Sequence, residues 1–234
     1  YKILKKKYSL VKIKIFKSIN DYNGSYKFDF VVLATKPIDL KNALNDLNNI
    51  QLKKQTAIIS IIAGKKIKVI SKKFNHIKNI YRVMPNIPAI ISESMNCIVA
   101  NNNASKTINK EVKKLFSYSG KTIFFKHENF IDMATAVSGS GPGFIFNLID
   151  AMEKAAIKIG FNDNTAKILV NETFRGSINL LISKNLQASE LVNQVATKGG
   201  TTEAGLAVMK KNKIHKIFED LVKTSYKKAK NQAK

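Results

Sequence analysis

The chain has 234 residues, of which 44% are hydrophobic and 24% are charged, with 1 Cys, no Trp and a formal net charge of +24. This composition is typical of a globular protein of one or two domains, and a single cysteine, Cys97, excludes a disulfide framework and a thiolate zinc site. The 3 histidines show no short metal-ligand spacing, so we expect no metal centre.

The positive charge is carried almost entirely by lysine, because only Arg82 and Arg175 among the 40 basic residues are arginine. The lysines are spread along the chain, whereas phosphate and base-edge recognition favours the arginine fork. We therefore expect a solvated cationic surface and no nucleic-acid partner, with a lysine-rich nucleic-acid or anionic-surface module as the alternative. No apolar stretch approaches the roughly 20 residues of a membrane span, so we expect no membrane partner. The single cysteine leads us to expect a reduced, cytoplasmic location.

Short β-branched runs alternate with polar helical stretches in the first half of the chain. The runs predict strands at residues 12–16, 28–34, 56–62, 77–84 and 94–100. Residues 38–48 have the apolar spacing of an amphipathic helix. Strands that alternate with helices predict βαβ units and a parallel sheet.

The second half changes to helical patterns after about Lys126. Residues 142–160 carry apolar side chains at helical spacing and end at Gly160. Further helices are predicted at residues 163–183, 189–195, 202–210 and 213–229. The sequence therefore predicts an α/β domain over residues 1–126, followed by an all-helical domain over residues 127–234.

The segment Val31-Val-Leu-Ala-Thr-Lys-Pro37 joins the end of a buried strand to a turn. In an open α/β sheet, ligands bind at the carboxyl ends of the strands, so this turn is placed to contact a cofactor. The alternative interpretation is an ordinary strand-to-helix connection with a proline near the helix start.

The segment Ser138-Gly-Ser-Gly-Pro-Gly143 opens the helix predicted at residues 142–160. Ser140 is a candidate N-cap, Pro142 suits the first helical turn, and the glycines allow backbone N–H groups to approach a ligand. Capping with close helix packing explains the same pattern. A nucleophilic serine is not supported, because no base stands at a spacing that would place it beside the hydroxyl.

The segment Val195-Ala-Thr-Lys-Gly-Gly-Thr-Thr-Glu-Ala-Gly205 places two adjacent glycines before a helix with hydroxyl side chains in its first turn. The N–H groups and the positive dipole end of such a helix favour an anion, here a small carboxylate. Thr201 and Thr202 would supply oriented hydroxyls. Simple capping by threonine is the alternative, but a cap does not require two glycines.

These three segments, together with Ile58-Ile-Ser-Ile-Ile-Ala-Gly64, Arg82-Val-Met-Pro-Asn-Ile-Pro88 and Asp132-Met-Ala-Thr135, resemble the pyrroline-5-carboxylate reductase family. The resemblance covers nearly the whole chain. Each segment alone is a weak indication of the family, but the segments in this order are jointly specific for it. It implies an oxidoreductase of proline biosynthesis that reduces the cyclic imine 1-pyrroline-5-carboxylate to L-proline. The fold it implies is a Rossmann-type cofactor domain followed by a helical dimerisation domain, with NADPH, less often NADH, as hydride donor.

The resemblance also assigns residues to the site. Those expected to line the cofactor are Ala34, Thr35, Lys36, Pro37, Ala63 and Gly64, with Met84, Pro85 and Asn86 near the nicotinamide end. Those expected to bind substrate are Ser140, Gly199, Gly200, Thr201 and the catalytic candidate Thr202. Hydride attack is easiest on a protonated imine, and a threonine hydroxyl is a weak acid. We therefore expect Thr202 to polarise and orient the imine nitrogen, while the proton comes through water.

Family members form intertwined dimers through the helical domain, often assembled into larger rings, so the resemblance implies a homodimer whose site is shared between subunits. Within the same fold class, the β-hydroxyacid dehydrogenases are the alternative. They need a catalytic lysine on a helix of the second domain. The candidates Lys154, Lys158 and Lys167 lack a matching motif.

The sequence departs from the family pattern in three places. Lys198 stands where the family carries proline, and Gly143-Phe144 stands where it carries Ala-Tyr. The N-terminal strand with its Gly-x-Gly-x-x-Gly phosphate cradle is not found, so we interpret the chain as starting roughly 30 residues late, after the first β-α-β unit. A chain without that unit is expected to bind NADPH poorly, because the pyrophosphate normally rests on it.

Overall fold

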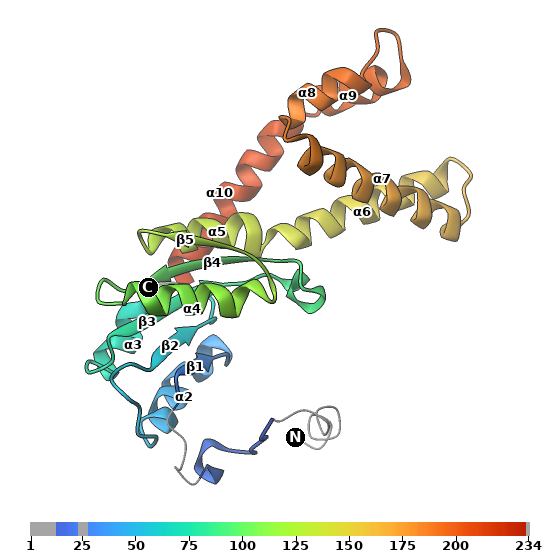
Figure 1. Cartoon of the computed structure of the whole chain (residues 1–234). Coiled ribbons are helices and arrows are strands. Elements are labelled where there is room, and N and C mark those ends of the chain that lie inside the picture. The colour runs from blue at the N-terminus through green and yellow to red at the C-terminus, as the bar shows by residue number, and fades with distance from the viewer. Residues whose placement is uncertain (1–12, 23–27, 233–234) are drawn as a thin grey trace. The chain divides into compact units, whose positions relative to one another are not determined.

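A computed structural model describes residues 13–22 and 28–232 of the protein, which form two compact units (Figure 1). The sheet unit contains the described residues up to Gly139 together with those from Tyr226 onward. The helical unit is Ser140–Ser225. In the part of the chain that is described, no helix combines the length and apolarity needed to cross a bilayer.

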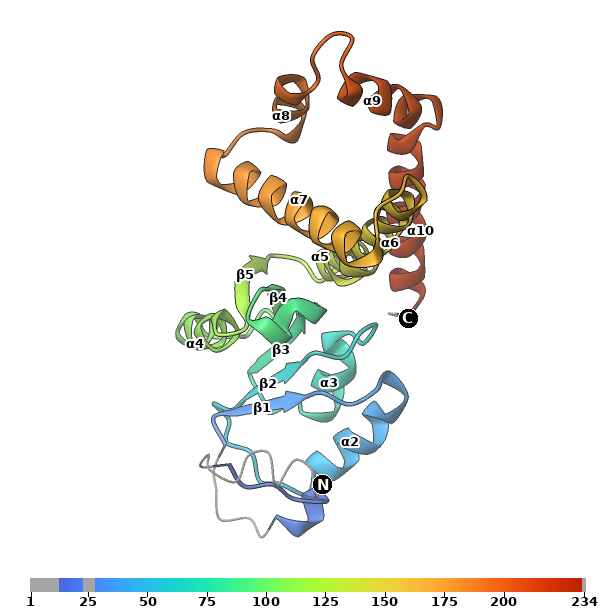
Figure 2. The same cartoon turned by 90° about the vertical axis from the view of Figure 1, so that its right-hand side faces the viewer.

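The sheet unit is built on a five-stranded sheet whose strands lie side by side in sequence order (Figure 2). The strands are β1 (Phe30–Leu33), β2 (Ala57–Ser60), β3 (Asn79–Met84), β4 (Ser94–Ala100) and β5 (Gly120–Phe125). The pairs β1–β2, β2–β3 and β4–β5 are parallel, which confirms the predicted Rossmann-type α/β fold. The pair β3–β4 is antiparallel, because its short connection holds only the 3₁₀ helix η3 (Ile87–Ile91) and a parallel crossover needs a longer one.

Helices cover both faces of the sheet (Figure 2). The strand side chains alternate between the two faces, so the helices on each face bury one half of them. On one face, Ile58 and Ile80 pack with residues of the helices α2 (Leu40–Leu47), α3 (Ile67–Lys73) and α5 (Asn129–Ala134). On the other, Ile59 and Tyr81 pack with Val112 of α4 (Lys106–Ser117). Because both faces are covered, β2 is buried at every residue, as its continuous apolar run indicates.

Local sequence signals explain where several helices begin. A proline opens the 3₁₀ helix η2 (Pro37–Asp39) that leads into α2. The Ser105 hydroxyl caps α4 by accepting a hydrogen bond from the N–H of Ile108 at 3.1 Å. A π-helical segment, η4 (Thr135–Gly139), follows α5 directly. A short 3₁₀ helix, η1 (Ile19–Asp21), precedes the sheet.

The strand predicted at residues 12–16 is wrong over residues 13–16, which the structure describes as irregular; Lys12 lies outside the described residues. The other predicted strands are present, shortened at some of their ends. Residues 13–16 have the β-branched composition of a strand, but strand formation depends on pairing and packing more than on composition.

The helical unit contains the helices predicted for the second half of the chain. They are α6 (Gly141–Lys158), α7 (Asp163–Lys184), α8 (Ala188–Val195), α9 (Thr201–Lys211) and α10 (Ile214–Gln232), whose last turns belong to the sheet unit. The side chain of Asn162 caps α7, and Asn185 ends it in the left-handed conformation. Within Ser140–Ser225, only Ala166 and Val170 are buried, so this unit has almost no core of its own.

Candidate active site

The three segments expected to line the cofactor follow the carboxyl ends of β1, β2 and β3. The register pairs Leu33 with Ser60 and Ser60 with Arg82, so these three strands end at the same edge of the sheet. Residues 34–37, 63–64 and 84–86 are therefore gathered at one edge, where open α/β sheets bind ligands.

The backbone at this edge is shaped for close approach. Ala34, Thr35, Lys36 and Pro37 are exposed. Gly64 is buried and has φ +67°, and a Cβ atom at this position would lie 2.8 Å from a backbone oxygen of the sheet unit's last turns. A side chain at Gly64 would thus meet both strain and a clash, so the tight turn after β2 requires glycine.

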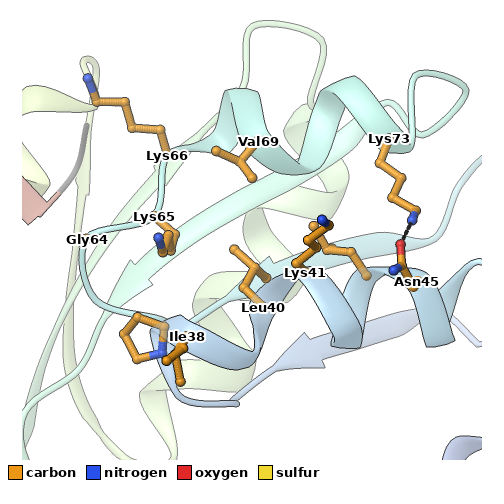
Figure 3. Close-up of a pocket in the computed structure, with 11 residues that line it drawn as sticks. Ile38, Leu40, Lys41, Asn45, Gly64, Lys65, Lys66, Val69 and Lys73 are labelled. Carbon is orange, nitrogen blue, oxygen red and sulfur yellow. Dashed lines mark hydrogen bonds between the residues drawn. The ribbon is translucent and has the colours of Figure 1, made fainter.

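A cavity of about 490 Å³ lies beside this edge, between α2 and α3 (Figure 3). Pro37 and Gly64 form part of its wall, so it is continuous with two of the expected cofactor segments. Four lysines line it and no acidic side chain does: Lys41, Lys65, Lys66 and Lys73. Lys73 donates a hydrogen bond to the side chain of Asn45, while Lys66 points away from the other side chains. The cavity suits an anionic group.

Asn86, expected near the nicotinamide, uses its side chain to join three pieces of backbone. Its Oδ1 accepts hydrogen bonds from the N–H of Met95 at 2.9 Å and from the Ser94 hydroxyl at 3.1 Å. Its Nδ2 donates to the carbonyl of Ser138 at 3.0 Å. The side chain of Asn86 therefore ties the end of β3 to the start of β4 and to η4.

The expectation that the Ser140 side chain caps α6 is wrong. Ser140 stands at the N-cap position, but its backbone is helical and its side chain makes no capping hydrogen bond. The reason is that η4 leads straight into α6, so there is no free helix start for a hydroxyl to cap. The neighbouring Ser138 hydroxyl donates instead to the carbonyl of Ala134 at 2.9 Å and lies 3.7 Å from the Cys97 sulfur.

The Gly-Gly turn of the helical unit begins α9. Gly199 has φ +74° and Gly200 is the N-cap residue, so the backbone conformation does use the first glycine. The first-turn N–H groups of Thr201 and Thr202 have no intrahelical acceptor, which leaves them available to an anion. Thr202 is half-buried and lines an apolar cavity of about 320 Å³ with side chains of α7 and α8.

Glu203 is a residue of this turn that the sequence analysis did not assign. Its carboxylate accepts a hydrogen bond from the N–H of Gly199 at 2.8 Å. Glu203 thereby holds the turn in shape and places a negative charge beside it. An acid directly after the two threonines was the visible signal for such a role.

The structure thus groups the expected residues into two sets. The cofactor residues form one edge of the sheet unit, and residues 199–202 form one turn of the helical unit. Among the described residues, no cluster of three or more His, Cys, Asp or Glu side chains has the arrangement of a metal site.

Comparison with known proteins identifies the family. The signature described as pyrroline-5-carboxylate reductase dimerisation matches residues 128–232. Pyrroline-5-carboxylate reductase 2 of Bacillus subtilis (strain 168) is 31% identical over 201 residues, which are 86% of this chain and 71% of that protein. The chain belongs to the pyrroline-5-carboxylate reductase family. The resemblance inferred from the sequence motifs is therefore confirmed.

Other members of the family agree. The pyrroline-5-carboxylate reductase of Haemophilus influenzae is 31% identical over 203 residues, covering 86% of this chain and 74% of that one. The structure of the Coxiella burnetii enzyme matches with a TM-score of 0.87 at 25% identity, over 100% of this chain and 84% of that chain. The Plasmodium falciparum enzyme, solved with NADP bound, matches with a TM-score of 0.84 at 26% identity, over 94% and 82%.

Proposed function

We propose that the protein is a pyrroline-5-carboxylate reductase of proline biosynthesis, which transfers a hydride from NADPH or NADH to the imine carbon of 1-pyrroline-5-carboxylate. The observation that carries the proposal is the 31% identity to the Bacillus subtilis enzyme across 86% of the chain. The β-hydroxyacid dehydrogenase and nucleic-acid alternatives have no comparable support.

The sheet edge supports a dinucleotide site. The buried turn at Gly64 leaves no room for a side chain, and the lysines of the adjoining cavity suit phosphate oxygens. Ala34, Thr35, Lys36, Pro37, Ala63 and Gly64 would hold the cofactor, with Met84, Pro85 and Asn86 toward its nicotinamide. NADPH supplies the hydride when bound, as the NADP of the Plasmodium falciparum structure suggests.

The turn that begins α9 supports a substrate site. Gly199, Gly200, Thr201 and Thr202 would form the carboxylate site, in which the first-turn N–H groups of Thr201 and Thr202 donate to the substrate at the positive end of the helix. Ser140 remains a candidate substrate contact. Thr202 would orient the imine nitrogen through its hydroxyl, while a water molecule delivers the proton, because a threonine hydroxyl is too weak an acid to do so.

Further parts of the proposal concern organisation. We assign residues 1–126 to cofactor binding and residues 127–234 to dimerisation and substrate binding, in a homodimer that assembles into a larger ring. The helical unit buries only two residues, which supports pairing, because its exposed apolar side chains need a partner to cover them.

A cytoplasmic location fits the buried free thiol of Cys97. The lysines are proposed to form a solvated surface without nucleic acid.

The test is NADPH oxidation by the full-length protein with 1-pyrroline-5-carboxylate, using Thr202→Ala and Thr202→Ser as variants. We expect Thr202→Ala to lower kcat by about tenfold to a hundredfold, because an oriented polar contact at the reacting atoms is lost. Thr202→Ser keeps the hydroxyl and should retain most of the rate. Full turnover by Thr202→Ala would refute the role of this residue, and no turnover by a folded wild-type protein that binds NADPH would refute the proposed reaction.

A further inference from the structure

A buried ionic cluster lies directly behind the proposed nicotinamide end of the site. Arg82 of β3 is 2% exposed, and its guanidinium donates to Asp132 Oδ1 at 2.7 Å and to Glu128 Oε1 at 3.3 Å. Glu128 Oε1 also accepts the N–H of Ile67, the first residue of α3, at 2.8 Å. The cluster therefore binds α5 and α3 to the strand that ends at Met84.

Holding a helix on a sheet by a buried ion pair costs more free energy than holding it by apolar packing. Removing an arginine and a carboxylate from water costs free energy that the ion pair only partly returns, and apolar side chains of similar volume often pack as stably. Ile131 of α5 already provides an apolar contact to the same core. The two hydrogen bonds of Arg82 add a fixed direction, because the planar guanidinium donates to its two carboxylates in a defined plane.

The element fixed in this way is the π-helical segment η4. It continues α5, and the Thr135 and Ser138 hydroxyls donate to carbonyls four residues earlier, at 2.7 and 2.9 Å. A second tether reaches η4 from the other side, from Asn86 Nδ2 to the Ser138 carbonyl at 3.0 Å. At Gly139, a Cβ atom would lie 2.8 Å from the Met84 Cε, so η4 packs directly against the Met84 side chain at the end of β3.

We propose that Arg82 and Asp132 are positioning residues, which hold η4 in register against residues 84–86 and so fix one wall of the hydride-transfer site. This inference rests on the proposed function for its effect on catalysis. Neither side chain needs to touch the substrate or cofactor. Their role is to keep Met84, Asn86 and the η4 backbone in a single arrangement, because small displacements at a site that aligns two reactants are costly.

The experiment compares Asp132→Asn with the matched control Asp29→Asn in the full-length protein. Asp29 forms an ion pair with Lys53 in the same unit, but its side chain is 80% exposed. We expect Asp132→Asn to speed amide hydrogen exchange in η4 and to lower kcat, each by about tenfold, with the KM for NADPH changed by less than about threefold. Asp29→Asn should leave both measurements unchanged.

The exchange measurement separates positioning from simple loss of folded protein, since a smaller folded fraction would lower kcat at unchanged KM without faster exchange confined to η4. If Asp132→Asn does not fold, Arg82→Lys is measured in the same way, because it keeps a buried cation but loses the fork. Unchanged exchange in η4, or unchanged kcat in a variant whose η4 exchanges faster, would overturn the inference. If the wild-type protein shows no turnover, the exchange result still decides whether the cluster holds η4, while the proposed function fails separately.

Discussion

Tyr81 shows how a single buried side chain makes stability depend on pH. It is 0% exposed, and its hydroxyl donates to Asn109 Oδ1 at 2.8 Å. Burial raises the pKa of Tyr81 above its ordinary value, so the folded protein holds this proton more tightly than the unfolded chain. The resulting stabilisation is complete at pH values below about 10, the pKa of a tyrosine in the unfolded chain. It is lost as the pH rises from there through the higher pKa of Tyr81 in the folded protein.

We therefore expect Tyr81→Phe to lower the free energy of unfolding by about 1 kcal/mol at neutral pH, because the Asn109 acceptor loses its donor. Above pH 10, the wild-type protein should lose stability more steeply than the variant, since only the wild type has this phenol to ionise. Urea unfolding across a pH series measures both effects. Parallel curves for the two proteins at alkaline pH would contradict the assignment.

Individual site residues differ in how far the sequence could describe them. The motif containing Asn86 marked it as a site residue, but its hydrogen bonds to Met95 and Ser138 join partners that are distant in the chain, which no local pattern encodes. The cap expected at Ser140 was a local inference, and it was wrong because the preceding π-helical segment removes the helix start. Contacts made across the fold are set by packing, and only the folded chain shows them.

At the scale of elements, the pairing of β4 with β5 depends on one glycine. Gly120 has φ +142°, and a Cβ atom there would lie 2.1 Å from the backbone oxygen and 2.3 Å from the backbone nitrogen of Ser94. Ser94 and Gly120 begin the register of this strand pair. Backbone atoms on both sides leave no flexible group to move, so any side chain would force the two strands apart.

We expect Gly120→Ala to lower the free energy of unfolding by at least about 2 kcal/mol, from combined strain and clash. The matched substitution Gly176→Ala lies inside α7, where a new Cβ meets nothing within 4 Å. It should be neutral or stabilising by up to about 1 kcal/mol, because alanine is the better helix former. Denaturant unfolding of both variants measures the difference, and equal effects would refute the steric argument.

Periodicity predicted most of the strands and helices and missed several others. The strands at β2, β3 and β4 and the helices α6 to α10 were predicted close to their observed bounds. The strand β5 and the helices α3 and α4 were not predicted, and in both helices lysines stand between the apolar residues. The antiparallel direction of β4 follows from the length of its connection to β3, which periodicity does not report.

At the scale of the whole molecule, the helical unit exposes an apolar surface that a second chain is expected to cover. Large apolar side chains that are at least half exposed recur along its helices: Phe146, Ile159, Ile168, Ile178, Ile182, Val195, Val208 and Ile217. The dimerisation signature matches this part of the chain. Many exposed large apolar side chains on one unit are typical of a subunit interface.

We expect light scattering to give the mass of two chains or a multiple of it. Ile182→Glu, on α7, should raise the dissociation constant at least about tenfold, because a buried isoleucine contributes about 1.5 to 3 kcal/mol. Tyr118→Glu is the control, since this exposed side chain ends α4 in the sheet unit. A monomeric wild-type protein, or equal effects of the two substitutions, would contradict a dimer formed through the helical unit.

The sequential order of the five strands also bears on how the chain folds. Each strand pairs with its neighbours in sequence, so the loops that must close are short and their entropic cost is low. The sheet unit can therefore form in a first-order step that does not depend on protein concentration. The helical unit, with two buried residues, gains most of its apolar burial only on association, so its consolidation is second order in chain concentration. Dilution would slow the appearance of active enzyme during refolding while leaving the formation of the sheet unaffected.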